Sequence, residues 1–311
     1  PVKEKIKTTA SKEAMRWCDE VQEGGIERGP SESGNDFDIR MSEEPDGVLA
    51  AQKIVDILRQ RGVCLIEANA PLELIRAAHD EAESLLEEGE FKPPMRVHDD
   101  RSMLEAQLWS QALQDEEKAV WIRESESKAV HLKNALKLLG KNMADFCGGL
   151  GPLLEKDLGV SFDRIGQAML TCYTGERQYA LHIDNPHAGH EQGLPDNGMK
   201  LSCTYFINPH WDPSEGEQGG LDVYLTDPTK SPPSAAGCRT SRKIRVAPHA
   251  DTLVMFLSER MAHQVVATQS KEERWFAMHL WCLDGAAMQQ MSRKLMAMRQ
   301  SGRQDSDDDE P

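Results

Sequence analysis

The feature that most constrains the fold is a train of short β-strand patterns in the second half of the chain. These segments are rich in β-branched and aromatic residues and are separated by Gly, Pro and Asp turns. No helical pattern interrupts them, so we expect no βαβ units. The pattern predicts an α+β domain with a jelly-roll or barrel core of about eight strands, at 166–173, 178–184, 200–208, 220–226, 243–247, 252–257, 263–268 and 274–283.

The residues before this train are predicted to be mainly helical. Asp46 is placed to cap a helix that runs to Arg61, and Pro71 opens a second helix that ends near Gly89. The other expected elements are a strand at 63–67, a helix over 127–158 that breaks at the Gly- and Pro-rich residues 148–152, and an outer helix at 286–299.

These patterns predict a single folded domain over 46–300. It divides into helical support at 46–160, a jelly-roll core at 164–284 and a C-terminal helix at 285–300. The polar, weakly periodic residues 1–45 are expected to be mostly disordered, apart from a short helix near 11–22, and residues 301–311 to form a disordered acidic tail.

The net charge of −16 narrows the class of partner. Nucleic acids and anionic membrane surfaces bind basic patches, so neither is expected as a main partner. No apolar run is long enough to span a bilayer, and the first residues lack the apolar core of a secretory signal. We therefore expect no membrane partner.

The seven cysteines indicate a reducing compartment. They are scattered, odd in number and form no Cys-x-x-Cys pair, which argues against a disulfide framework and against a zinc knuckle. Several lie within apolar strand patterns, where a thiol behaves as a small hydrophobic group. We expect reduced thiols and a cytoplasmic or nuclear location.

Four His-x-Asp pairs are candidate metal ligands, whereas about one is expected by chance among ten histidines. Side chains at i and i+2 of a strand share a face, so an imidazole and a carboxylate spaced in this way can bind one side of a metal ion. Only His182 and Asp184 end a strand pattern that further strands follow. His98 lies in a charged segment, His210 lies between prolines, and His249 lies in a predicted turn.

A third ligand is expected from a late strand that lies beside the first one in a rolled sheet. His263 opens such a strand, 79 residues after Asp184, which leaves room for about four strands between them. Two histidines and one carboxylate form a facial triad with open positions, which suits non-heme Fe(II). The alternatives are a hydrogen-bonded strand-end pair at 182 and 184 and a core histidine at 263.

Arg274 and Tyr173 are candidate ligands for an organic anion. A guanidinium inside a barrel needs an anionic partner, and its planar fork fits a carboxylate. A small dicarboxylate would chelate the metal at one end and bind Arg274 at the other, with Tyr173 adding a hydroxyl. The alternatives are a surface position for Arg274 and a core position for Tyr173. His187 and His190 are interpreted as solvated loop residues.

At this point the sequence resembles the Fe(II)- and 2-oxoglutarate-dependent dioxygenases, and among them the prolyl hydroxylases of the oxygen-sensing, hypoxia-inducible-factor type. The resemblance covers residues 50–285. The motifs that carry it are Arg61-Gly62-Val63-Cys64, Ala119-Val120-Trp121-Ile122, Cys172-Tyr173-x-Gly175, Tyr179-x-x-His182-x-Asp184-Asn185-Pro186, Cys203-x-Tyr205-x-x-Asn208, Trp211-Asp212, Gly219-Gly220 and Trp281-Cys282-x-Asp284.

The resemblance implies a double-stranded β-helix in which His182, Asp184 and His263 hold Fe(II). It further implies that Tyr173 and Arg274 bind 2-oxoglutarate as co-substrate, that O2 is the second co-substrate, and that ascorbate is a candidate reductant. The reaction so implied converts a proline of a protein or peptide into hydroxyproline, with succinate and CO2 as products.

The sequence departs from the family pattern at three places. Arg274 lies further from His263 than the basic residue of this family usually lies from its last ligand, and counting back from Trp281 puts Trp275 in that place. Phe206 stands where the oxygen-sensing enzymes have a tyrosine. The connections 209–219 and 227–242 are longer, so the substrate surface is expected to differ. Two alternative functions stay open: hydroxylation of a free small molecule, and a non-catalytic cupin-like binding module.

Overall fold

Two β-sheets form the core of the computed structural model, which describes residues 35–91, 118–122, 134–174, 181–189, 196–211, 219–225, 242–268 and 273–304. The larger sheet has the strand order β1-β2-β9-β6-β11-β5-β3, with β4 beside β11, and the smaller sheet has the order β10-β7-β8. Every neighbouring pair is antiparallel except β1 and β2. The predicted α+β jelly-roll core is confirmed.

The strands follow the predicted train closely. Those at Thr252–Leu257 and Arg274–Leu283 have the predicted bounds. The predicted strand over 178–184 is described only from residue 181, and there His182 forms an isolated bridge and no strand. The strands are β1 (Ile39–Arg40), β2 (Val63–Glu67), β3 (Lys118–Trp121), β4 (Arg164–Ile165), β5 (Met169–Thr174), β6 (Met199–Phe206), β7 (Leu221–Tyr224), β8 (Lys243–Val246), β9 (Thr252–Leu257), β10 (His263–Val265) and β11 (Arg274–Leu283).

Helix α2 (Gly47–Arg61) begins and ends where its sequence signals predict. The Asp46 carboxylate accepts hydrogen bonds from the backbone N–H groups of Val48 and Leu49, and Gly62 closes the helix in the left-handed conformation. The other helices are α3 (Leu72–Glu87), α6 (Asn134–Leu158), α7 (Gly285–Gln304) and the short 3-10 turns η1 (Met41–Glu43) and η3 (Pro186–Gly189).

The predicted break of the long helix at 148–152 is wrong, because α6 continues through Pro152. The glycines of α6 serve close packing instead. A Cβ at Gly148 would make an ordinary contact with Ile165 at 3.4 Å, whereas one at Gly151 would lie 3.3 Å from the Phe162 ring, which is tighter than an ordinary contact. Glycine here lets the helix approach the segment that leads into the sheet.

The ordered fold begins earlier than residue 46. Residues 35–45, which the sequence placed in a disordered segment, contain β1 and η1, and Ile39 and Met41 are buried in the core. The predicted helix near 11–22, the acidic residues 305–311, His98, His190 and most of the long connections 209–219 and 227–242 lie outside the described residues.

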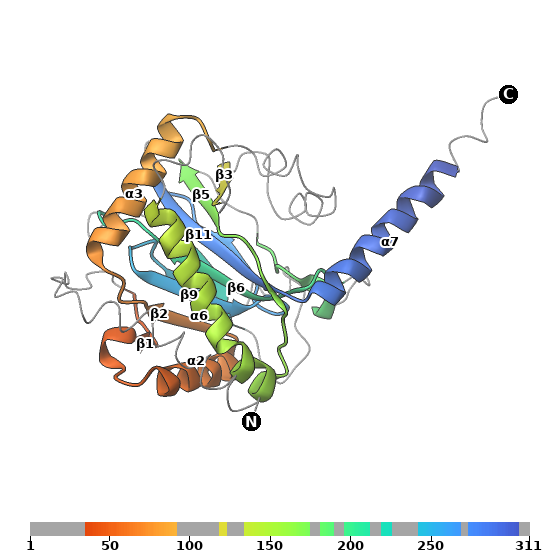
Figure 1. Cartoon of the computed structure of the whole chain (residues 1–311), viewed down its shortest axis with the longest axis horizontal. Helices are drawn as coiled ribbons and strands as arrows, with labels where there is room; N and C mark the ends of the chain where they lie inside the picture. Colours follow the sequence, from red (N-terminus) through yellow and green to blue (C-terminus); the bar gives the residue numbers. More distant parts are fainter. Residues whose placement is uncertain are drawn as a thin grey trace.

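The larger sheet has helices on one side and the candidate site on the other. Phe276 of β11 packs edge-on against His79 of α3, with ring centroids 5.6 Å apart. Figure 1 shows α6 crossing this sheet and α7 extending away from the body. The opposite side of β5, β6 and β11, which carries the paired residues Tyr173 and Trp275 and the paired residues Ser202 and Trp281, is called the inner face below.

A partly buried carboxylate, that of Asp251, ties the loop after β2 to the turn before β9. Asp251 accepts hydrogen bonds from the backbone N–H groups of Asn69 and Ala70, at 2.8 and 3.0 Å, and from the Tyr205 hydroxyl at 3.0 Å. Burial raises the pKa of Asp251 to about 7, although these donors act in the opposite direction.

The helices of the described part of the chain include none that is both long and apolar enough to cross a lipid bilayer.

Candidate metal centre

His182 and His263 lie side by side at the β10 edge of the smaller sheet. These residues form an isolated antiparallel bridge, in which the His182 N–H donates to the His263 carbonyl at 3.0 Å and the His263 N–H donates to the His182 carbonyl at 2.9 Å. Directly opposed residues of antiparallel strands project their side chains to one side, so the two imidazoles are neighbours. Their ring centroids lie 4.2 Å apart.

Asp184 completes a cluster of three metal-ligating side chains. Its Oδ1 lies 3.3 Å from His182 Nε2 and 3.6 Å from His263 Nε2. The ligand atoms of the three residues all lie within 4.8 Å of one another. The side chains of His182, Asp184 and His263 are 20%, 10% and 8% exposed, so the site opens to solvent on the His182 side.

Neighbouring groups orient two of these ligands. The Ser202 hydroxyl and the Trp281 indole N–H both donate to Asp184 Oδ2, the latter at 3.2 Å, which leaves Oδ1 for a metal ion. His263 Nδ1 lies 3.1 Å from the Met261 carbonyl. A carbonyl only accepts, so Nδ1 carries the proton and Nε2 keeps its lone pair for a metal ion.

The protonation states suit metal binding. Burial would raise the pKa of Asp184, but the charge of His263 and the hydrogen bond from His182 outweigh it and hold that pKa well below its usual range. Burial, reinforced by neighbouring His182, lowers the pKa of His263 to about 4. A carboxylate and a neutral imidazole are the forms that bind metal ions.

Two asparagines hold the loop that follows Asp184. The Asn185 amide donates to Asp196 and to the Met199 carbonyl at 2.8 and 2.9 Å, and the Asn197 amide donates to the Asp184 carbonyl at 2.6 Å. Both asparagines are buried. The backbone at the carboxylate ligand is thereby fixed to the start of β6.

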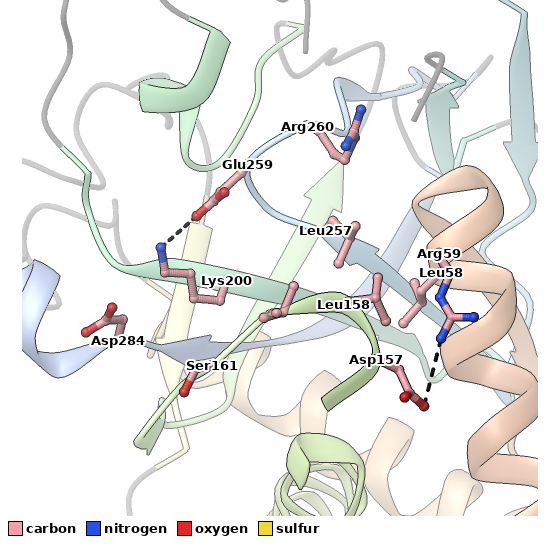
Figure 2. Close-up of a pocket in the computed structure, with 12 residues that line it drawn as sticks. Leu58, Arg59, Asp157, Leu158, Ser161, Lys200, Leu257, Glu259, Arg260 and Asp284 are labelled. Carbon is pink, nitrogen blue, oxygen red and sulfur yellow. Dashed lines mark hydrogen bonds and ion pairs between the residues drawn. The ribbon is translucent and has the colours of Figure 1, made fainter. Parts of the chain in front are cut away.

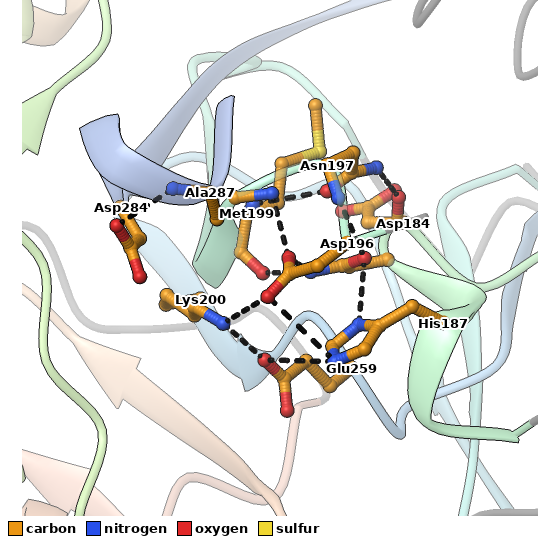
Figure 3. Close-up of polar contacts among 11 residues, drawn as sticks. Asp184, His187, Asp196, Asn197, Met199, Lys200, Glu259, Asp284 and Ala287 are labelled. Atoms are coloured by element: carbon orange, nitrogen blue, oxygen red, sulfur yellow. Dashed lines mark hydrogen bonds and ion pairs between the residues drawn. The ribbon is translucent and has the colours of Figure 1, made fainter. Parts of the chain in front are cut away.

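A second cluster of possible metal ligands, next to this loop, already binds a lysine ammonium. His187, Asp196 and Glu259 also bring ligand atoms together, but Lys200 Nζ lies 2.9 Å from Asp196 Oδ2 and 2.6 Å from Glu259 Oε1 (Figure 3). The ammonium takes the place that a metal ion would need. This group therefore forms a surface ion-pair network.

A cavity of about 500 Å³ lies beside the ion pair of Lys200 and Glu259. Lys200 and Glu259 line it together with Arg59, Asp157, Arg260 and Asp284 (Figure 2). Its lining includes none of the three candidate metal ligands, and its charges of both signs already form pairs, such as Arg59 with Asp157.

The structure brings one of the two expected co-substrate residues to the site. Tyr173 lies on the inner face, where its ring packs on that of Trp275 at a centroid distance of 4.2 Å. Arg274 lies on the other side of β11, where it binds Glu83 of α3 at 2.6 Å and is 45% exposed. Successive strand residues face opposite sides, so Trp275 occupies the inner position that the sequence analysis assigned to Arg274.

The described residues of the other His-x-Asp pairs lie apart from the triad. Asp251 binds the loop at Asn69, as described above. His249 Nδ1 faces the Ala250 carbonyl at 3.1 Å. The ring of His210 lies near that of His79, with centroids 6.3 Å apart.

Four inner-face residues were given no role at the site from the sequence alone: Ser202, Trp281, Trp275 and His279. Ser202 and Trp281 bind Asp184, and the buried Trp275 indole N–H has no hydrogen-bond partner among the described residues. Strand parity could have found three of them, because residues 275, 279 and 281 alternate on one face of β11. Nothing in the sequence indicates that Ser202 contacts Asp184.

The comparison with family models agrees with this geometry. Residues 168–282 match the model described as 2OG-Fe(II) oxygenase superfamily. The matched segment is of the 2OG-Fe(II) oxygenase family. It runs from the start of β5 almost to the end of β11 and includes His182, Asp184 and His263. No curated protein sequence matches the chain.

Solved structures with a similar fold include two prolyl hydroxylases. A Pseudomonas putida prolyl-4-hydroxylase is 18% identical with a TM-score of 0.51, over 75% of this chain and 98% of that chain. A Trichoplax adhaerens prolyl hydroxylase, in complex with a hypoxia inducible factor oxygen degradation domain peptide fragment, is 19% identical with a TM-score of 0.57, over 79% of this chain and 96% of that chain.

A third similar structure has a different activity. The non-heme alpha ketoglutarate dependent epimerase SnoN from nogalamycin biosynthesis is 13% identical with a TM-score of 0.50, over 76% of this chain and 83% of that chain. At such identities these likenesses establish the fold alone.

Proposed function

We propose that this protein is an Fe(II)- and 2-oxoglutarate-dependent dioxygenase that hydroxylates a proline of a protein or peptide. The observation that carries the proposal is the placement of Asp184 Oδ1 within 3.6 Å of both imidazole Nε2 atoms, in a segment of the 2OG-Fe(II) oxygenase family. A two-histidine, one-carboxylate set leaves one side of the metal open. Iron bound there would supply the activation of O2 and the oxidation of 2-oxoglutarate to succinate and CO2.

The residues of this chain hold and orient the reacting groups. His182, Asp184 and His263 would bind the metal, and Ser202 and Trp281 fix the free oxygen of Asp184. The buried Trp275, whose ring packs on that of Tyr173, fills part of the interior beside the site.

A peptide substrate is supported by the Trichoplax adhaerens relative, which was solved with a peptide fragment. The similarity to that relative covers 79% of the present chain. The negative charge of the chain favours a basic or neutral substrate peptide over nucleic acid. We further propose a cytoplasmic or nuclear location, supported by the buried free thiols of Cys64, Cys147, Cys172, Cys203 and Cys282.

The proposal is tested by measuring CO2 release from 2-oxoglutarate with Fe(II) and O2. We expect release by the unaltered protein, loss in His182→Ala, and retention in His249→Ala, which removes a histidine of another His-x-Asp pair. Equal activity of the two variants would contradict the proposal. Peptide mass spectrometry that detects the gain of one oxygen atom on proline would test the substrate class.

Hydroxylation of a free small molecule is the second candidate, supported by the likeness to the epimerase SnoN. In that case CO2 release would persist and no peptide proline would gain oxygen. A non-catalytic binding module would bind metal at the triad without releasing CO2.

A further inference from the structure

The turn between β9 and β10 approaches two of the three candidate metal ligands. At its start, the Ser258 hydroxyl lies 2.8 Å from the hydroxyl of Ser202, which in turn donates to Asp184 Oδ2. At its end, the Met261 carbonyl lies 3.1 Å from Nδ1 of His263. Ser258 is thus one hydroxyl away from the carboxylate ligand.

The directions of these hydrogen bonds follow from the groups involved. The Asp184 carboxylate only accepts, so the single proton of the Ser202 hydroxyl is committed to it. The Ser202 oxygen is left as the acceptor for the proton of Ser258. The two hydroxyls form a chain of donors that ends at the carboxylate, and hydrogen bonds in such a chain strengthen one another.

The chain lies in the interior of the protein. Ser258 is 0% exposed and Ser202 is 2% exposed. Removal of one partner of a buried hydrogen bond costs more than its removal at the surface, because water does not replace the lost partner.

Backbone contacts hold Ser258 beside the loop that carries the ligand. Its carbonyl accepts a hydrogen bond from the Asn185 N–H at 2.9 Å, and its own N–H donates to the Lys200 carbonyl at 3.2 Å. Asn185 directly follows Asp184 in the sequence. The side chain of Ser258 therefore supports the carboxylate while its backbone supports the next residue.

The turn itself is anchored on both flanks. The Leu257 N–H donates to the Gly62 carbonyl, at the end of α2, at 2.9 Å. Glycine at position 62 leaves room for the turn, because a Cβ there would collide with the Met261 sulfur. Glu259 binds Lys200 of β6 at 2.6 Å (Figure 3). These contacts fix the place of the turn relative to α2 and β6.

We infer that Ser258 is a positioning residue for the metal centre and aligns Asp184 through the hydroxyl of Ser202. The inference rests on the proposed function and deepens it. A serine hydroxyl rotates about its C–O bond, and a donor on its oxygen favours the orientation in which its proton points at Asp184 Oδ2. Oδ1 is thereby kept toward the two imidazoles, as partners of metal ligands commonly do.

The test is a double-mutant cycle on metal affinity, measured by calorimetric titration of the full chain with Co(II). The four proteins are the unaltered chain, Ser258→Ala, Ser202→Ala and the double variant. We expect Ser258→Ala to weaken Co(II) binding by about two- to tenfold, the range for one hydrogen bond between neutral groups. In the Ser202→Ala background the same substitution should have no further effect, because its partner is absent.

A second readout separates positioning from a general loss of stability. The visible absorption spectrum of bound Co(II) depends on the arrangement of its ligands, so it should shift in Ser258→Ala. The matched control, Thr252→Val, removes another fully buried hydroxyl at the opposite end of β9, where it accepts from the Asn35 amide at 3.2 Å. This variant should keep the affinity and the spectrum of the unaltered protein, even where its melting temperature falls.

Unchanged Co(II) affinity or an unshifted spectrum in Ser258→Ala would overturn the inference, as would an equal loss of affinity in both backgrounds. A loss in Thr252→Val equal to that in Ser258→Ala would also overturn it, because affinity would then follow stability alone. Failure of the unaltered protein to bind Co(II) would instead refute the metal centre on which the proposed function rests.

Discussion

The hydrogen bond from Ser202 to Asp184 offers a quantitative test of the metal centre. Two donors, the Ser202 hydroxyl and the Trp281 indole, bind the same oxygen, Asp184 Oδ2. Replacement of Ser202 by alanine removes one of them and leaves the other in place. The carboxylate then gains freedom to rotate, and its Oδ1 is no longer held toward the two imidazoles.

The size of the effect follows from burial and charge. Ser202 is 2% exposed and Asp184 is ionised, so the bond is charge-assisted and shielded from water. Such a bond contributes about 1.5–3 kcal/mol. At about 1.4 kcal/mol for each factor of ten, metal affinity should fall by roughly ten- to a hundredfold, in line with the effect of removing outer partners of metal ligands.

Calorimetric titration with Co(II) measures this affinity in Ser202→Ala and in a matched control, Ser84→Ala. The Ser84 hydroxyl donates to the Asp80 carbonyl at an exposed position of α3, far in sequence from the triad. We expect unchanged affinity in the control. If Ser202→Ala keeps a native melting transition and binds Co(II) within about twofold of the unaltered protein, the assigned role of Ser202 is wrong.

Two further predictions concern stability. Burial raises the pKa of Asp251 to about 7 from an unperturbed 3.8, so the folded state binds this proton more tightly than the unfolded state. The protonated Asp251 therefore contributes its full share of the free energy of unfolding below about pH 4, and this share is lost as the pH rises through 7. Urea unfolding at several pH values in this range should show that Asp251→Asn removes this pH dependence. The same pH dependence in the variant and in the unaltered protein would contradict the assignment. Asp46→Ala removes the N-cap of α2 and should lower the free energy of unfolding by about 1 kcal/mol, whereas no loss in the same assay would show that the cap contributes nothing.

The sequence predicted the strands and the metal triad because both depend on local patterns. Alternation and turn residues place β9 and β11 at their observed bounds. His182 and Asp184 share a face through their spacing, and His263 reaches them because a late strand returns beside an early one. These are consequences of strand geometry, which a single sequence displays.

The interior position of Arg274 was predicted wrongly, because its charge was given more weight than the alternation of side chains along the strand. Arg274 was assigned to the interior because a buried anion needs a cation, but parity with Trp281 puts Trp275 there. The alternative of a surface position, which the sequence analysis left open, describes the observed Arg274. The contacts of His279 with Thr171 and Thr204 could not be predicted, because they come from two other strands and cross-strand partners follow only from the register.

The helix through Gly148 and Pro152 shows the limit of propensity. Glycine and proline predict a break in an isolated helix, yet α6 continues through them, and Gly151 allows it to pack closely against the Phe162 ring. Tertiary contacts of this kind cannot be counted before the fold is known.

An anaerobic crystal structure of the protein with Fe(II) tests the central claim most directly. We expect one iron ion bonded to His182 Nε2, Asp184 Oδ1 and His263 Nε2, with the opposite coordination positions open to solvent or to an added 2-oxo acid. Iron bound elsewhere, or a triad whose side chains turn away from a common point when iron is supplied, would contradict it.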